Sequence, residues 1–192
     1  ACGEKNVLFT NNDSAYEAAI SLFQKGINIE AIVDNREEID SKLIKETEKN
    51  NIKVYKGYTV VDTFGYKRIN KISIMQLSKD GQKVVGSRIS ITCDCLGISG
   101  GWTPAVHLFT QSGGKLKFRD EDQVFIPDKY PSDQISIGSC NGDFTLDEIL
   151  LILPTTLKEF LNLKKTDYED LEVQSSFNKS KRNIWLLPSD KI

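Results

Sequence analysis

Residues 6–34 decide the fold, and they read NVLFTNNDSAYEAAISLFQKGINIEAIVD. Asn6–Phe9 is a short apolar run bounded by polar residues, which is typical of a buried parallel strand. Small and apolar residues then recur at helical spacing over Ala15–Phe23, and Gly26 supplies a stop. Ile29–Val33 is a second apolar run. The stretch therefore predicts a βαβ unit.

The next segments predict a parallel sheet followed by an antiparallel one. Residues 37–50 are amphipathic and predict a helix, and residues 52–55 predict a third parallel strand. Three further runs predict the strands of a β-meander: 58–61, 68–77 and 84–92. Residues 95–99 then return as a buried strand. The fold class that we predict is α/β, with a Rossmann-like three-layer arrangement of a parallel sheet and an antiparallel β-meander.

The remainder of the chain is richer in loops. Short strands are predicted at 115–118 and 123–126, and a buried strand at 135–138. A helix is predicted over 145–153, ending at Pro154, with a charged and initially helical tail beyond it.

Composition excludes several classes of function. The 192 residues are 39% hydrophobic and 27% charged, which suits a folded core, and the formal charge of -2 gives no general attraction to nucleic acid or to an anionic membrane. No apolar run approaches the roughly 20 residues that span a bilayer, and no signal peptide opens the chain. We therefore predict a cytoplasmic protein.

The residues that often carry chemistry form no catalytic or metal-binding pattern. The spacing of the four cysteines, Cys2, Cys93, Cys95 and Cys140, fits neither a disulfide framework nor a paired zinc site. His107 is the only histidine and has no evident nucleophile beside it in the sequence. We predict no catalytic residue and no metal ligand.

The turn after the first strand is the candidate nucleotide site. A Rossmann unit places a diphosphate where the strand meets the helix N-terminus, because free backbone N–H groups favour anions there. The candidate residues are Thr10, Asn11, Asn12, Asp13 and Ser14, and glycines are missing from the usual positions. Asn12 occupies space that the diphosphate would use, although asparagine tolerates the left-handed backbone of such a turn.

Two further pairs complete this candidate site. Asp34 ends the second strand, where an acid can bind a ribose hydroxyl of NAD, while Arg36 could instead hold the 2′-phosphate of NADP. Alternatively, Asp34 caps a loop. Gly100 and Gly101 end a strand and either let the backbone approach a nucleotide or form a simple turn.

Three motifs resemble those of thioredoxin-reductase-like flavoproteins. Residues 13–19 resemble their second dinucleotide-binding motif. Asp94, Gly101 and Pro104 have the spacing of the motif at which the chain returns to the flavin-type domain. Residues 137–142 resemble the closing motif, except that a serine, Ser139, stands where an aspartate normally contacts the flavin ribityl chain.

Residues 7–16, 99–108 and 111–115 together resemble the alpha subunit of heterotetrameric sarcosine oxidase, over roughly residues 6–150. The resemblance implies that the chain is an internal fragment of a longer subunit. It implies NAD binding, flavins (FAD and FMN) held elsewhere in a complex with a beta subunit, and oxidation of sarcosine to glycine.

The resemblance also implies three segments and leaves three hypotheses. Residues 1–97 would form an NAD(P)-binding-type domain, 98–153 a return segment of an FAD/NAD-binding-type domain forming a partial second nucleotide-binding half, and 154–192 a helical linker. The first hypothesis is an NAD-binding component of an oxidase alpha subunit. The others are an assembly module that has lost nucleotide binding, and an NAD(P)H-dependent disulfide reductase module.

Overall fold

The computed structural model describes residues 3–39, 41–131, 133–162 and 188. The chain divides after Gly101 into two compact units, and each is considered by itself. Cys2 and most of the predicted tail, from residue 163 onward, lie outside the described residues. Within the described part of the chain, no helix is both long and apolar enough to cross a membrane.

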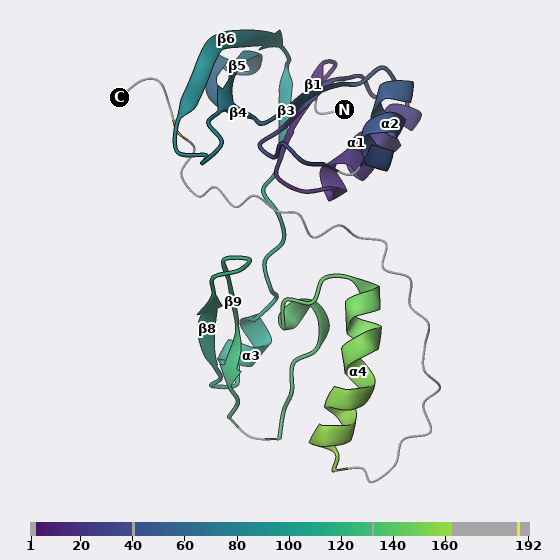
Figure 1. Ribbon diagram of the computed structural model, residues 1–192, viewed down its shortest axis with the longest axis vertical. Coiled ribbons are helices and arrows are strands. Elements are labelled where there is room, and N and C mark those ends of the chain that lie inside the picture. Colours follow the sequence, from purple (N-terminus) through teal and green to yellow (C-terminus); the bar gives the residue numbers. More distant parts are fainter. Residues whose placement is uncertain (1–2, 40, 132, 163–187, 189–192) are drawn as a thin grey trace. The chain divides into compact units, whose positions relative to one another are not determined.

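The first unit is built on a parallel sheet of four strands (Figure 1). In spatial order these are β3 (Lys53–Lys56), β2 (Ile29–Asp34), β1 (Asn6–Thr10) and β7 (Cys95–Ser99). Each neighbouring pair runs parallel. The predicted βαβ unit is confirmed, because α1 (Ser14–Gln24) connects β1 to β2.

Strand alternation gives the parallel sheet two buried faces. On one face Val7, Phe9 and Val33 form a core with Ile72 and Ile74 of the antiparallel sheet. On the other face the side chains that pack with α1 and α2 (Ser41–Lys49) come from the intervening positions, including Leu8 and Ile32. Because successive side chains of a strand point to opposite faces, β1 and β2 carry apolar residues at consecutive central positions.

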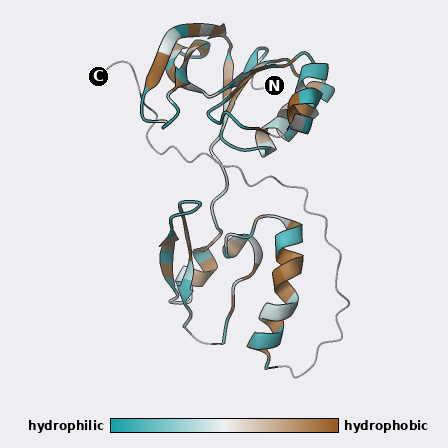
Figure 2. Cartoon of the chain, viewed as in Figure 1, coloured by the Kyte–Doolittle hydropathy of each residue, from teal (hydrophilic) through white to brown (hydrophobic). Residues whose placement is uncertain are grey.

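The antiparallel sheet forms the third layer. Its strands are β4 (Tyr58–Gly65), β5 (Ile69–Leu77) and β6 (Val84–Thr92), in that order. Ile72 and Ile74 of β5 face the core shared with the parallel sheet, and Figure 2 shows both hydrophobic and hydrophilic residues along these strands. The predicted α/β class with a β-meander is confirmed.

Asp94 fastens the start of β7 to the segment before β1. Its carboxylate accepts hydrogen bonds from the backbone N–H groups of Glu4 at 3.0 Å and Lys5 at 2.8 Å. These N–H groups hold the pKa of Asp94 below its usual range. Asp94 therefore joins the residues before β1 to the start of β7 at one end of the sheet.

The second unit contains α3 (His107–Gln111), the hairpin β8 (Lys115–Arg119) and β9 (Val124–Lys129), the short 3₁₀ helix η1 (Gly138–Cys140), and α4 (Leu146–Phe160). A capping box starts α4, in which Thr145 accepts from the Glu148 N–H and the Glu148 carboxylate accepts from the Thr145 N–H.

Three predictions of secondary structure were wrong. Residues 135–138 form no strand, because no described strand pairs with this apolar segment. The last helix does not end at Pro154, which lies inside α4 and removes only one backbone N–H donor from its 15 residues. The helix predicted from residue 37 begins at Ser41, because the residues before it continue the loop that holds Arg36.

Both predicted segment boundaries fall inside secondary-structure elements. The boundary between residues 97 and 98 lies inside β7, and the one between 153 and 154 lies inside α4. The functional roles assigned to the three segments stay predictions.

Candidate functional site

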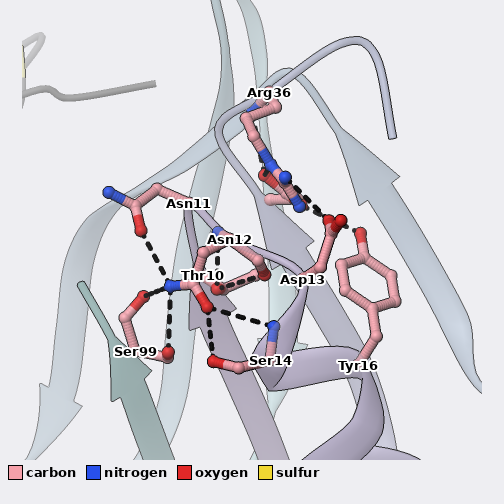
Figure 3. Close-up of polar contacts among 9 residues, drawn as sticks. Thr10, Asn11, Asn12, Asp13, Ser14, Tyr16, Arg36 and Ser99 are labelled. Atoms are coloured by element: carbon pink, nitrogen blue, oxygen red, sulfur yellow. Dashed lines mark hydrogen bonds and ion pairs between the residues drawn. The ribbon is translucent and has the colours of Figure 1, made fainter. Parts of the chain in front are cut away.

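The turn from β1 to α1 lies at the carboxyl end of the parallel sheet and is closed by its own side chains (Figure 3). Thr10 Oγ1 accepts a hydrogen bond from the Asn12 N–H and donates one to the Asn12 carbonyl, both at 3.1 Å. Neither Asn11 nor Asn12 has a positive φ. The turn therefore does not use the left-handed backbone that asparagine tolerates, and it keeps its shape through side-chain hydrogen bonds.

The Asn12 side chain fills the centre of the turn, where it is 5% exposed. Its amide nitrogen donates to the carbonyl and to the hydroxyl oxygen of Ser99, each at 3.1 Å, and to Asn11 Oδ1 at 2.9 Å. Its Oδ1 accepts from the backbone N–H of Ser14 at 3.2 Å and from the Ser14 hydroxyl at 2.5 Å. Asn12 thus takes the first N–H of α1, which is one of the donors that a phosphate would use.

Gly100 and Gly101 meet this turn from the end of β7. Asn11 Nδ2 donates to the Gly100 carbonyl at 3.0 Å. Gly101 has a φ of 106°, and a Cβ built there would lie 3.6 Å from Asn11 Oδ1. The structure thus brings the predicted glycine pair to the predicted turn, but in contact with an asparagine side chain.

Arg36 lies between two aspartates, beside the turn (Figure 3). Its Nη1 lies 2.8 Å from Asp13 Oδ1, and its Nη2 lies 2.8 Å from Asp34 Oδ2. Its Nε also donates to both oxygens of Asp34, at 3.1 and 3.2 Å. Burial lowers the pKa of Arg36, but the two carboxylates outweigh burial and raise it above its ordinary value. The guanidinium is therefore a permanently charged partner of both aspartates.

Asp34 is fully buried, at 0% exposure, and its remaining partners are internal. Oδ1 accepts from the Arg36 backbone N–H at 2.9 Å, and Oδ2 accepts from the Tyr16 hydroxyl at 3.0 Å. Burial, and then the negative charge of Asp34, raise the pKa of Tyr16 above its ordinary value. The phenol therefore stays a hydrogen-bond donor throughout the neutral range.

The sequence-predicted residues converge on one place, but their arrangement does not fit a bound dinucleotide. The ribose-binding candidate Asp34 has no exposed surface, and the N–H of Ser14 is already bonded. The cluster holds two carboxylates against one guanidinium, so a diphosphate would add negative charge to a site that already has an excess of it. We therefore derive no reaction step through NAD at this turn.

Sequence reasoning missed two residues of the site, Tyr16 and Ser99. The available signal for Tyr16 was a phenol among the buried alanine and isoleucine positions of α1, where a polar group needs a partner. Ser99 gave no comparable signal, because only the pairing of β7 with β1 brings it opposite Thr10.

The other candidates form no reactive centre. Cys93 is buried, and burial raises the pKa of its thiol above the ordinary value. His107 is exposed at the start of α3. Among the described residues, no group of three or more histidine, cysteine or acidic side chains could hold a metal ion.

Comparison with solved structures gives the class of fold. Thioredoxin reductase from T. acidophilum matches 82% of this chain and 52% of its own, with a TM-score of 0.52 and 17% identity. The oxidoreductase FprA from Mycobacterium tuberculosis matches 86% of this chain and 56% of its own, with a TM-score of 0.52 and 14% identity. The chain thus has the Rossmann-like fold of FAD/NAD(P)-dependent oxidoreductases.

Comparison with curated proteins is more specific, although no family model matches. The chain is 30% identical over 144 residues to sarcosine oxidase subunit alpha from Corynebacterium sp. strain P-1, covering 74% of this chain and 14% of that protein. It is 28% identical over 126 residues to the corresponding subunit from Rhizobium meliloti strain 1021, covering 66% of this chain and 11% of that protein. The chain is thus a relative of sarcosine oxidase alpha subunits, as the motifs predicted, and spans a small part of their length.

Proposed function

We propose that the chain is part of the alpha subunit of a sarcosine oxidase-type flavoprotein complex, which oxidatively demethylates sarcosine to glycine. It contributes a dinucleotide-binding-type domain to that subunit and not the amine-oxidising centre. The similarity to alpha subunits supports this assignment. Its partner is a beta subunit, its location is the cytoplasm, and the FAD and FMN of the complex are bound outside this chain.

The geometry of the β1–α1 turn bears on whether this domain binds NAD or is an assembly module that has lost nucleotide binding. An NAD-binding domain needs free N–H groups at the start of α1 and an accessible acid at the end of β2. Here the Ser14 N–H already donates to the Asn12 side chain. The Asp34 carboxylate already accepts from Tyr16 and pairs with Arg36. The geometry therefore favours an assembly module that keeps the fold and has lost nucleotide binding at this turn.

A disulfide reductase module is disfavoured by its thiols. Cys93 and Cys95 are separated by one residue, whereas a reductase of this kind needs a C-x-x-C pair. The buried Cys93 has a raised pKa, so little of the reactive thiolate forms at neutral pH.

Calorimetry with NAD, and with NADP for comparison, tests the choice between these versions. We expect no saturable heat from the purified chain. Saturable NAD binding that weakens in an Asp34→Ala variant would restore the NAD-binding version and contradict the assembly module.

A retention assay tests the membership of the complex. The bait is an immobilised beta subunit of a sarcosine oxidase, and an unrelated flavoprotein on the same resin is the control. We expect the chain to be retained on the beta subunit alone. Equal retention on both resins, or on neither, would contradict the proposed assembly role.

A further inference from the structure

The start of α1 carries a buried carboxylate that does not cap the helix. Asp13 is the N-cap residue, yet its side chain makes no capping hydrogen bond, and its backbone is already helical, with φ −75° and ψ −26°. The side chain is only 6% exposed and is directed to Arg36 instead (Figure 3). Its charge therefore lies beside the helix N-terminus without being used by the helix N–H groups.

Arg36 is the cation that pairs with the Asp13 carboxylate. Its side chain is 4% exposed, and it is positioned by Asp34 at the end of β2. A cation at this point, together with a helix N-terminus, is the electrostatic environment in which dinucleotide domains hold phosphate groups. In this chain the anion in that environment is Asp13.

We infer that Asp13 and Asn12 are an internal substitute for the bound diphosphate. The Asp13 carboxylate supplies the negative charge that Arg36 and the helix favour, and Asn12 Oδ1 supplies the acceptor for the Ser14 N–H. The site is thus permanently occupied by the chain itself, and a nucleotide would have to displace a buried ion pair to enter. This inference rests on the proposed function in one respect: both hold that no nucleotide binds at the turn.

Chemical rescue by a small anion tests the inference. In an Asp13→Ala variant the carboxylate is removed while Arg36 remains, which leaves a cavity and a cation that formate can fill. We expect the thermal midpoint of the variant to rise saturably by about 5 °C when chloride is replaced by formate at equal ionic strength. The wild-type midpoint should change by less than about 1 °C in the same exchange.

Two matched variants control for general salt effects. Asp13→Asn removes the charge but keeps the volume, so it should lose stability without rescue by formate. Asp62→Ala removes a carboxylate from the partly exposed ion pair with Arg88, where no cavity forms, and should also show no rescue.

Equal shifts in wild type and Asp13→Ala, or an equal rise in Asp62→Ala, would overturn the inference. If Asp13→Ala does not fold in chloride, its refolding yield in formate becomes the measurement, and no recovery there has the same meaning. Retention on the beta subunit, measured with wild type, reports on the proposed function separately, because it does not depend on the response to formate.

Discussion

Replacing Arg36 by methionine should be among the most damaging single changes in the first unit. Arg36 is the cation between Asp13 and Asp34, and both carboxylates are almost completely buried. Methionine preserves much of the apolar stem of arginine but none of its charge or hydrogen bonds. The two aspartates would then lie close together in the interior without the guanidinium.

The contact distances set the expected loss. At 2.8 Å and an effective dielectric constant of 20, each ion pair has a gross Coulomb energy of about 6 kcal/mol. Dehydration of the buried guanidinium offsets much of this, and removing one partner of a buried pair costs about 3–5 kcal/mol in practice. For a slope of about 2 kcal/mol per molar urea, the midpoint should fall by about 2 M.

Urea unfolding followed by far-ultraviolet circular dichroism measures this loss. Arg88→Met is the matched control, because Arg88 pairs with Asp62 at 3.3 Å in a partly exposed position, and such a pair contributes at most about 1 kcal/mol. A loss no larger than that of Arg88→Met would refute the argument that the buried cluster depends on Arg36.

Three further predictions concern single side chains. Tyr16→Phe should lower the free energy of unfolding by about 1.5–3 kcal/mol, because Asp34 loses a hydrogen-bond donor. Because the pKa of Tyr16 is raised in the folded state, its stabilising contribution is complete below about pH 10 and is lost as the pH rises further. Stability measured against pH for wild type and Tyr16→Phe will show both effects. Gly114→Ala should cost about 1–3 kcal/mol, because the added Cβ would overlap the Phe109 ring, as chemical denaturation of the second unit will measure. Cys93 should react with iodoacetamide more slowly than Cys95 in the folded protein, as mass spectrometry of the labelled peptides will show.

The parallel sheet could be predicted from sequence because its information is local. The apolar runs 6–9 and 29–33, the helical spacing between them and the stop at Gly26 all lie within 29 consecutive residues. The segment 135–138 has a similar composition but forms no strand, since a strand also needs a neighbour to complete its hydrogen bonds. Composition indicates that a segment can be extended, whereas pairing depends on residues far away in the chain.

The sequence indicates which residues lie near the candidate site, but not which groups they contact. Asp34 and Arg36 lie beside the turn in the structure, whereas the sequence left open whether Asp34 contacts a ribose or caps a loop and whether Arg36 holds a phosphate. The answer depends on Tyr16, which lies 18 residues before Asp34 and reaches it only after α1 packs on β2. That contact buries Asp34 completely, and no spacing rule within the turn contains it.

The loss of glycine from the turn and the presence of Asp13 are best understood together. Glycines at this turn leave room for a ligand and for close backbone approach, and they supply no hydrogen bonds of their own. Once Asn12 fills that room, the turn is stabilised by Ser14 and Ser99 without any left-handed residue, so the fold no longer requires glycine. Arg36, which is already paired with Asp34, takes Asp13 as its second carboxylate partner in the dry interior. Asn12, which fills the nucleotide's place, and its neighbour Asp13 thus provide contacts that the diphosphate would have made.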